Sequence, residues 1–425
     1  MGIDSGMSAC KCAVAGTLIN VVDGYEKIEE IKPGDTVLSY NVDDLSIFTQ
    51  KIVDAGSFIS DCVEVDSSLS SPLSCSCTHP FWTQRGWVDA EDLTTDDIVA
   101  VLKAKLPTNK PIPQDELDFI TIMIFEGSTT HGMKYFVNFD KEVVDVMRAA
   151  CDSLCIDMID CKIDGRYRFR STFGGDKRNV RLNALLDKYG INNCQSKKKR
   201  LPKQFFSMPI EQKYRFVSLM LATDGYINTR GNMSIALASH GLIDDIKRLL
   251  NGIGISSSYR YRRVFYRKDS EKLPFDAWRL RLHKYTCSEM IDSVTFFHKQ
   301  DRVDKTKLAT QLNSYPLYHV LPKLKNGLVF MDKVGVSYSY CGEKDWNGGD
   351  FYSLCRQPQE TVMINKLDEL LPYEPDLEKI CNDPICWSRV TGVYNVGKQK
   401  VYYIETESEN YDNQNYFLND VITHN

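Results

Sequence analysis

Two residues that can break a peptide bond without an external substrate stand near the two ends of the 425-residue sequence. Cys12 opens the stretch CAVAGTLINV, and its thiol can attack the carbonyl carbon that precedes it. Asn425 is the last residue, directly after His424, and its side-chain amide can attack its own main-chain carbonyl. This pair of residues predicts self-cleavage at two junctions.

Cleavage at Cys12 needs a polarised peptide bond, a proton donor for the departing nitrogen and a site for the oxyanion. Ser76 and His79 lie three residues apart in the segment SCTHPFWTQRGW. A histidine beside a hydroxyl can supply the proton and the oxyanion site, so we expect both side chains to lie near Cys12.

A zinc site is an alternative for part of this segment. Cys75, Cys77 and His79 alternate along an expected strand, so their side chains can share one face. Thiols and imidazole are the ligands that zinc prefers. We favour the other interpretation, a partly buried strand beside the reactive cysteine.

The chain resembles an intein, a protein-splicing element, in three motifs. The family opens with Cys-x-x-x-Gly-Thr, continues with Thr-x-x-His-Pro, and ends in His-Asn. Cys10 is the weaker nucleophile candidate because its spacing to the Gly-Thr pair does not fit the family pattern. The matching residues are Cys12, Gly16 and Thr17 in the first motif, Ser76 (in place of Thr), His79 and Pro80 in the second, and His424 and Asn425 in the last.

The resemblance implies a mainly β, horseshoe-like splicing domain of the Hint type and a fixed order of steps. Cys12 converts the Lys11–Cys12 peptide bond to a thioester, while His79 protonates the departing nitrogen. The acyl group passes to a nucleophile just after the intein, and Asn425 then cyclises with help from His424. The implied partners are host-protein flanks (exteins) in cis, and splicing needs no cofactor.

Two features depart from the family pattern. Tyr403 stands where an acid is frequent, and Asn413 or Gln414 stands near a histidine position, so acid help for the last step is in doubt. Nothing follows Asn425 in the sequence, so the acceptor Cys, Ser or Thr is absent. We expect the chain as given not to complete splicing.

The pattern along the chain predicts one β domain split by a long insertion. Short alternating apolar runs, broken by Gly, Pro and Asp, occupy residues 12 to about 105 and return from about 384. Helical and strand patterns mix between 116 and about 310. We expect an upstream flank at 1–11, the splicing domain at 12–110 and 384–425, and an α/β insertion at 111–383.

Two apolar helices of one design lie in this insertion, and each ends in an acid followed by Gly. FITIMIFEG delivers Glu126, and VSLMLATDG delivers Asp224, 98 residues later. If the helices pack side by side, the carboxylates meet at their ends, where paired acids suit Mg²⁺ and phosphodiester hydrolysis. Small residues for the close helix contacts are Thr121, Ser218 and Ala222.

This design resembles the LAGLIDADG homing endonucleases, which are often inserted within inteins. Glu126 and Asp224 fall at the family's metal-binding acid, and Gly127 and Gly225 follow them. The resemblance implies two LAGLIDADG repeats in a pseudo-two-fold saddle, with Mg²⁺ as cofactor. It also implies site-specific cleavage of double-stranded DNA at the intein insertion site.

Cationic strands follow each acid, although the whole chain has a formal net charge of −5. Residues 161–203 hold 13 Lys or Arg against 3 Asp or Glu. A solvated sheet edge explains one such strand, but two matching ribbons predict contacts with phosphates and base edges of DNA. The arginines are Arg166, Arg168 and Arg170 in the first ribbon, and Arg260, Arg262, Arg263, Arg279 and Arg281 in the second.

Composition indicates the cellular compartment and argues against a membrane protein. The sequence has no apolar run of transmembrane length and no signal segment, and its 14 cysteines predict free thiols in a reducing compartment. We expect a cytoplasmic monomer that follows its host protein. Two alternatives stay open: a splicing element whose insertion is inactive and only binds DNA, and a DNA endonuclease with non-catalytic β flanks. The latter would not need Cys12 with Asn425.

Overall fold

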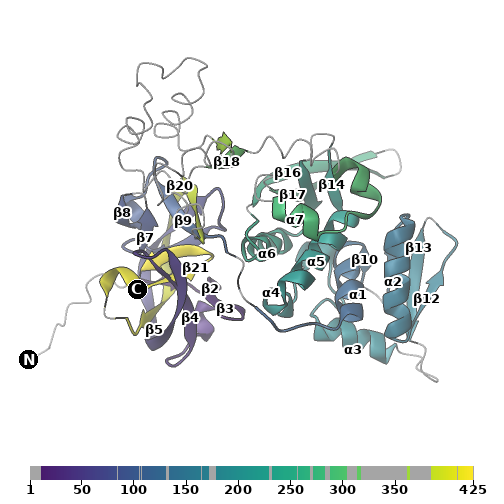
Figure 1. Ribbon diagram of the computed structural model, residues 1–425, viewed down its shortest axis with the longest axis horizontal. Coiled ribbons are helices and arrows are strands. Elements are labelled where there is room, and N and C mark those ends of the chain that lie inside the picture. Colours follow the sequence, from purple (N-terminus) through teal and green to yellow (C-terminus); the bar gives the residue numbers. More distant parts are fainter. Residues whose placement is uncertain are drawn as a thin grey trace, which may run out of the picture. The chain divides into compact units, whose positions relative to one another are not determined.

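The computed structural model describes most of the chain as two compact units (Figure 1). The described residues are 11–83, 85–104, 106, 108–130, 134–163, 165–171, 179–228, 232–255, 257–268, 271–282, 288–303, 314–316, 361–363, 384–408 and 410–424. Described parts of 1–105 and 312–425 form the first unit, and those of 106–311 form the second. Most of the expected upstream flank, most of 310–383 and Asn425 lie outside the described residues.

The first unit is built on a 12-stranded sheet whose described pairings are antiparallel. The strands are β1 (Ala13–Val14), β2 (Leu18–Val21), β3 (Gly24–Lys27), β4 (Thr36–Asn41), β5 (Ser46–Ser67), β6 (Leu73–Ser76), β7 (Pro80–Thr83), β8 (Gly86–Asp89), β9 (Ile98–Leu102), β20 (Ile385–Thr406), β21 (Asn415–Leu418) and β22 (Val421–His424). Short 3-10 turns are η1 (Ile28–Glu30), η2 (Ala90–Asp92) and η8 (Tyr411–Asn413), and a separate pair joins β18 (Ser314–Pro316) to β19 (Thr361–Met363).

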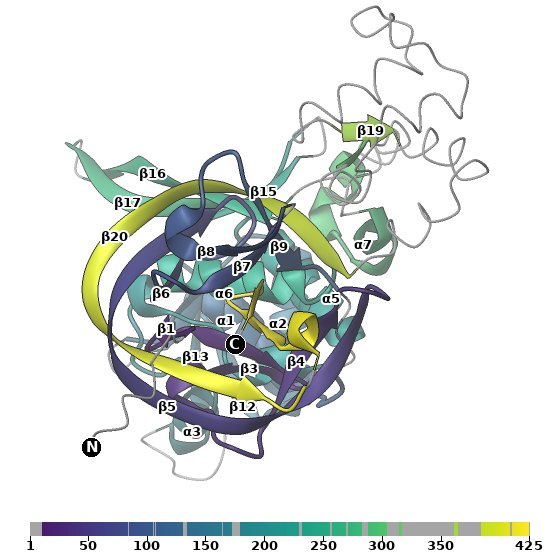
Figure 2. The same ribbon diagram turned by 90° about the vertical axis from the view of Figure 1, so that its left-hand side faces the viewer.

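Strands from the two ends of the sequence share this sheet. The long strands β5 and β20 pair along most of their length, and Figure 2 shows them arching around the unit. β1 pairs with β20 and β6, β21 pairs with β2, and β22 pairs with β7 and β9. The mainly β fold expected from the sequence is therefore built from strands that lie hundreds of residues apart in the chain.

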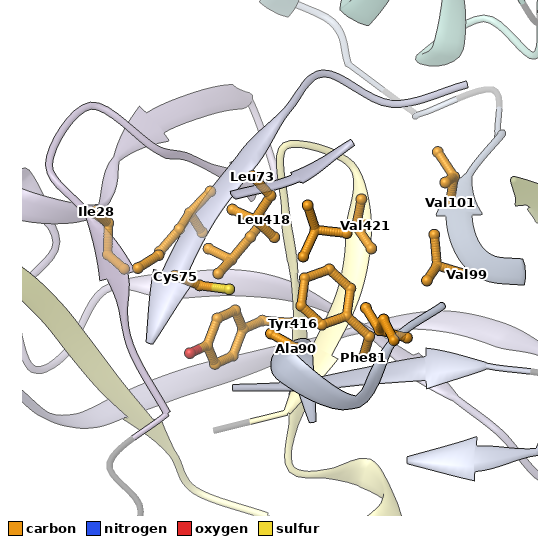
Figure 3. Close-up of a cluster of buried hydrophobic side chains, with 14 of the residues drawn as sticks. Ile28, Leu73, Cys75, Phe81, Ala90, Val99, Val101, Tyr416, Leu418 and Val421 are labelled. Carbon is orange, nitrogen blue, oxygen red and sulfur yellow. The ribbon is translucent and has the colours of Figure 1, made fainter. Parts of the chain in front are cut away.

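The core of this unit joins apolar side chains from many strands (Figure 3). Alternating residues of the short strands point inward, and burial of their apolar surface is the main favourable term in folding. β9 is buried at all five residues because protein covers both of its faces. Tyr416 and Phe81 are among the largest fully buried side chains.

The second unit combines helices with two four-stranded sheets. Its helices are α1 (Gln114–Phe125), α2 (Lys141–Ser153), α3 (Val180–Lys188), α4 (Gln204–Ser207), α5 (Ile210–Ala222), α6 (His240–Asn251) and α7 (Ser288–Ser293), with 3-10 turns η3 (Ser196–Lys198) and η5 (Phe297–Lys299). Its strands are β10 (Gly127–Ser128), β11 (Tyr135–Val137), β12 (Ile156–Asp160), β13 (Arg166–Ser171), β14 (Gly225–Ile227), β15 (Met233–Leu237), β16 (Ser257–Lys268) and β17 (Glu271–Leu282). Among the described residues, no helix has the length and apolar character needed to cross a bilayer.

An internal repeat organises this unit. The order helix, strand, strand, helix, strand, strand, helix occurs twice, from α1 to α3 and from α5 to α7. The two sheets also share one strand order, β10-β11-β13-β12 and β14-β15-β17-β16. The first helices of the two halves, α1 and α5, pack against each other.

The packing of α1 on α5 includes one ion pair. Thr121, Ser218 and Ala222, the small residues expected at close helix contacts, are all buried. Arg215 of α5 donates two hydrogen bonds to the Asp118 carboxylate of α1, at 2.9 and 2.8 Å. This bidentate pair fixes the register of the two helices along each other. It therefore also fixes the position of one helix end relative to the other.

Candidate functional site

Cys12 is buried immediately before β1, and pairing on both sides holds it there. The next residue, Ala13, pairs with Tyr402 of β20 and with Cys75 of β6. The Cys12 N–H donates to Ser76 Oγ at 3.2 Å, and the Ser76 N–H donates to the Cys12 carbonyl at 2.9 Å. Ser76 thus contacts both main-chain polar groups of Cys12, and its hydroxyl lies at the nitrogen of the Lys11–Cys12 peptide bond.

His79 is fully buried between β6 and β7, and neither ring nitrogen has a hydrogen-bond partner among the described residues. Burial lowers the pKa of His79 to about 3, and the charges of Lys11 and His424 act in the same direction. The Lys11 main chain lies close enough to favour the protonated ring slightly, but it is not in hydrogen-bond geometry. The result is a neutral imidazole beside the Lys11–Cys12 peptide bond, with both nitrogens available to exchange a proton.

His424 ends β22 inside a set of aromatic contacts. Its ring centroid lies 4.1 Å from that of Tyr411 and 5.0 Å from that of Trp87. Its Nε2 lies 2.8 Å from the Tyr411 carbonyl, and its Nδ1 lies 2.7 Å from Lys11 Nζ. The last contact joins residues 413 positions apart and places the neighbourhood of Cys12 beside His424. Asn425 lies outside the described residues.

The residues that depart from the intein pattern make other contacts. The Tyr403 hydroxyl donates to Asp54 at 3.1 Å, and the Gln414 amide donates to the Ser408 carbonyl at 2.8 Å. The carbonyl of Asn413 accepts a hydrogen bond from the Gln50 side chain at 2.6 Å. These contacts tie the strand ends of the sheet together.

The zinc alternative finds no support in the described residues. They contain no group of three His, Cys, Asp or Glu side chains placed to hold a metal ion. Cys75 is fully buried, and burial raises the pKa of its thiol well above the usual value.

In the second unit, Glu126 and Asp224 occupy equivalent places at the ends of α1 and α5. Glu126 is the C-cap residue of α1, and Asp224 lies two residues after the last residue of α5. A glycine is required after each acid. A Cβ at Gly127 would lie 2.6 Å from the Met123 carbonyl, and one at Gly225 would lie 2.5 Å from the Leu221 Cα.

Both carboxyl groups have raised pKa values, and Asp224 acts on Glu126. Burial, and then the negative charge of Asp224, raise the pKa of Glu126 to about 7. Asp224 is open to solvent, yet the protein around it removes enough water to raise the pKa of its carboxyl to about 6. The Asn138 amide donates to Glu126 at 3.3 Å. Two neighbouring carboxylates whose ionisation is disfavoured fit a divalent cation, since Mg²⁺ needs only one or two protein carboxylates and completes its shell with water and phosphate.

Two buried lysines complete this region, and the sequence did not single them out. Lys199 Nζ donates to three carbonyl oxygens at the end of α1, at 2.7–3.0 Å. Lys299 Nζ donates to four at the end of α5, at 2.5–3.4 Å. Burial lowers the pKa of both, that of Lys199 to about 8. Their spacing of 100 residues, close to that of the two acids, is the signal in the sequence that points to them.

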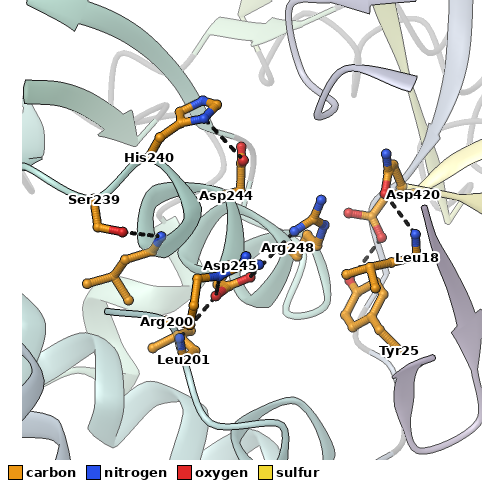
Figure 4. A network of polar contacts seen from close by, with 12 residues as sticks. Leu18, Tyr25, Arg200, Leu201, Ser239, His240, Asp244, Asp245, Arg248 and Asp420 are labelled. Atoms are coloured by element: carbon orange, nitrogen blue, oxygen red, sulfur yellow. Dashed lines mark hydrogen bonds and ion pairs between the residues drawn. The ribbon is translucent and has the colours of Figure 1, made fainter. Parts of the chain in front are cut away.

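The start of α6 positions Lys199, and Figure 4 shows the neighbouring Ser239 and the pair of Arg200 with Asp245. Ser239 caps this helix by accepting from the Leu242 N–H at 3.1 Å, and its hydroxyl donates to the Lys199 carbonyl at 2.7 Å. The next residue, Arg200, makes two hydrogen bonds of 2.6 Å to the buried Asp245 carboxylate of α6. The main chain on both sides of the lysine is therefore fixed.

The first cationic strand, β13, has one charged face and one aromatic face. Arg166, Arg168 and Arg170 are exposed, whereas Phe169 is buried. The Phe169 ring stacks on Phe136, with centroids 5.7 Å apart. The alternation expected from the sequence thus leaves the three arginine side chains exposed, with Arg166 over the Tyr135 ring and Arg170 paired with Asp157.

The second cationic strand pair, β16 and β17, lines a groove of about 470 Å³. Arg260 lies directly opposite Arg279, and like charges in this position destabilise a sheet unless an anion lies between them. Arg263 differs, because it pairs with Asp276 and does not line the groove. The lining residues are Tyr226, Asn228, Asn232, Ser234, Ser258, Arg260, Tyr261, Arg262, Arg279 and Arg281.

Comparison with known proteins gives one family. The family model described as the intein splicing domain matches residues 19–425. Similar solved structures include the bacterial intein-like domain from Clostridium thermocellum, with 24% identity, a TM-score of 0.20, and coverage of 22% of this chain and 67% of that one. A DnaB intein from Synechocystis sp. PCC 6803 shows 15% identity and a TM-score of 0.21, with 22% and 70% covered. A DnaX mini intein from Spirulina platensis shows 18% identity and a TM-score of 0.20, with 21% and 67% covered. No curated protein matches the chain.

Proposed function

Because the chain belongs to the intein splicing domain family, we propose that it excises itself through Cys12 at the upstream junction and Asn425 at the downstream junction. Family membership makes the chain a protein-splicing element joined in cis to flanks of a host protein. The observation that carries the residue assignment is the 2.7 Å contact between Lys11 and His424, which brings the neighbours of both junctions together.

At the upstream junction, the Cys12 sulfur forms a bond to the Lys11 carbonyl carbon, and the bond from that carbon to the Cys12 nitrogen breaks. His79 is neutral at pH 7, so its ring can take the thiol proton and return it to the departing nitrogen. The Ser76 hydroxyl, 3.2 Å from that nitrogen, holds it in place. The products are a thioester and a free amine, so no external reactant is needed.

At the downstream junction, the Asn425 side-chain nitrogen attacks its own carbonyl carbon and the bond to the following residue breaks. The proton lost by the side-chain nitrogen ends on the departing amine. His424 is the neighbouring group that can transfer it, and contacts with Tyr411 and Trp87 fix the ring orientation.

The test of splicing adds a segment beginning with Cys, Ser or Thr after Asn425 and follows the products by mass spectrometry. Ligated flanks and free intein should appear. Cys12→Ala should abolish ligation, because alanine has no nucleophile to accept the acyl group. The rate of ligation should fall by more than about 10³-fold. Cys10→Ala is the matched control and should splice normally. Normal splicing by Cys12→Ala would show that the nucleophile is assigned incorrectly.

For the second unit, we propose a Mg²⁺-dependent endonuclease of the LAGLIDADG type that cuts double-stranded DNA at the intein insertion site. The doubled order of elements, the matched acids at the ends of α1 and α5, and the cationic strands after each acid support it. Glu126 and Asp224 would hold Mg²⁺, which when bound polarises a phosphodiester and stabilises the charge of the leaving oxygen. Lys199 and Lys299 keep positive charge beside these acids.

The DNA contacts proposed for this unit come from two surfaces. Arg166, Arg168 and Arg170 present a cationic face on β13. Four arginines line the groove of β16 and β17, where an anion would relieve their repulsion. Phosphates supply that anion at regular spacing. An insertion that binds DNA without cutting it is the alternative supported by the same surfaces.

The cleavage test uses a plasmid carrying the uninterrupted host-gene sequence, incubated with the full chain and Mg²⁺. Linear product should form. Glu126→Gln and Asp224→Asn should each lower the cleavage rate by at least about 10²-fold while splicing continues. Glu142→Gln, an exposed acid of α2, is the control and should cut normally. Binding without cutting by the unaltered chain would favour the inactive alternative, and unchanged cutting by both variants would refute the metal-ligand roles.

A further inference from the structure

The contact between Lys11 and His424 fixes the protonation of the imidazole. An ammonium group only donates hydrogen bonds, so the His424 Nδ1, 2.7 Å from Lys11 Nζ, must be the unprotonated acceptor. The ring proton then lies on Nε2, which donates to the Tyr411 carbonyl at 2.8 Å. His424 is therefore held as one neutral tautomer with both nitrogens engaged.

The surroundings hold this arrangement in place. Lys11 is half-buried, and its Nζ lies 5.0 Å from the centre of the Tyr411 ring, where a cation–π contact adds to the hydrogen bond. The negative charge of Asp89 also acts on the Lys11 ammonium. A cation at hydrogen-bond distance opposes protonation of His424.

Lys11 belongs to the upstream flank, whereas His424 belongs to the downstream junction. We propose that Lys11 is a positioning residue that holds His424 inactive until the upstream flank has moved, so that Asn425 does not cyclise first. This inference rests on the proposed splicing function and adds an order-keeping contact to it.

The release follows from the chemistry of acyl transfer. Before the thioester forms, the Lys11 carbonyl carbon is bonded to the Cys12 nitrogen, which Ser76 holds, and in the thioester it stays tethered to the same residue through the Cys12 sulfur. After transfer, the carbon is bonded to the nucleophile that follows Asn425, so the tether to Cys12 is lost. The Nδ1 lone pair of His424 then becomes free to accept the proton that the Asn425 side-chain nitrogen loses. That proton passes to the departing amine as the carbon–nitrogen bond to the next residue breaks.

The experiment measures downstream cleavage when the upstream flank cannot move. The full chain carries a short peptide after Asn425 and the Cys12→Ala change, which keeps Lys11 in place. At a pH above the midpoint of the rate–pH profile, Lys11→Met should raise the rate of peptide release about tenfold, because the His424 Nδ1 lone pair no longer accepts a hydrogen bond from a charged donor and is free to accept the Asn425 proton. Lys11→Arg, which keeps a charged donor, should release peptide as slowly as lysine. Lys398→Met, an exposed lysine of β20, is the matched control and should change nothing.

A second readout separates this role from a structural one. The charged or titratable groups around His424 are Lys11, His79, Asp89, Tyr411 and Asp412. Removing the Lys11 cation should move the midpoint of the rate–pH profile of peptide release to higher pH, because His424 then binds a proton more readily. A structural defect would lower the rate without moving the midpoint.

Three outcomes decide the matter. Faster release with a shifted midpoint in Lys11→Met, and slow release in Lys11→Arg, support the inference. Equal rates for lysine, methionine and arginine overturn it, while splicing of the Cys12-containing chain shows that the proposed function stands. If no variant cleaves at either junction, including the chain with Cys12, the proposed splicing roles fail as well.

Discussion

At the level of single residues, Glu126 shows how burial and like charge prepare a site for a cation. Its carboxyl is partly buried at the end of α1, and Asp224 lies near enough to raise its pKa further. Lys299, Asn138 and Lys199 act in the opposite direction but do not cancel the effect. A proton or a metal ion is therefore needed to relieve the repulsion between the two acids.

We expect the affinity of the chain for Mg²⁺ to rise with pH between about 6 and 8, because protons compete with the metal for both carboxylates. Isothermal titration of the full chain at several pH values measures this. The rise should be several-fold, and it should be smaller in Glu126→Gln, which has no proton to lose at that position. An affinity independent of pH would contradict the proposed ligands.

The same shift affects stability in the metal-free chain. The pKa of Glu126 is raised from 4.5 to about 7, so the folded state binds this proton more tightly than the unfolded state. The stabilisation is present below pH 4.5 and is lost as pH rises through about 7. Relative to Glu126→Gln, the free energy of unfolding should fall by on the order of 2 kcal/mol across this range. Denaturant titrations of both proteins provide the comparison.

At the level of elements, β16 and β17 place like charges opposite each other. A sheet built only for stability would pair Arg260 with an acid, as it pairs Arg263 with Asp276. The Arg281 guanidinium donates to the Asn232 side chain at 2.9 Å, and both side chains line the groove. The pattern indicates that this strand pair is shaped for an anionic ligand.

We expect the double change Arg260→Ala and Arg279→Ala to weaken binding of duplex DNA and to lower its salt dependence. Each lost phosphate contact removes about 0.9 from the slope of log affinity against log salt, so the slope should fall by about 2. Fluorescence anisotropy at several KCl concentrations gives the slope. Unfolding free energy should stay level or rise, because repulsion is removed.

The control for this experiment is Arg263→Ala, on a residue that pairs with Asp276 and lies outside the groove. We expect it to change the slope less than the double variant does. If the double variant binds DNA with an unchanged slope but unfolds more easily, the arginines serve the sheet and the DNA surface lies elsewhere.

At the level of the whole chain, the sequence supports the family and the main elements for identifiable reasons. The motifs around Cys12, His79 and His424 are local, so they are visible without a structure. The helices α1, α5 and α6 form where apolar runs or a 3.6-residue period ends in Gly. Strand alternation likewise predicts which face of β13 carries the arginines.

Contacts that depend on tertiary packing could not be predicted in this way. In the run of three lysines at 197–199, Lys199 is only 3% exposed while Lys197 and Lys198 face solvent. Only its spacing of 100 residues from Lys299 sets Lys199 apart from the neighbouring lysines in the sequence, because the carbonyl groups that it contacts lie at the end of a distant helix. The contact between Lys11 and His424 spans 413 positions and is equally hidden.

The junction between β9 and β20 has a consequence for how such genes change. Leu102 pairs with Ile385, and the Lys103 N–H donates to the Pro384 carbonyl at 2.7 Å. The chain therefore leaves the sheet at the end of β9 and returns to it at the adjacent start of β20. The entropy of closing a loop grows only with the logarithm of its length. A sheet in which these two strand ends are adjacent can accept, exchange or lose a long intervening segment during evolution while its own strand register stays the same.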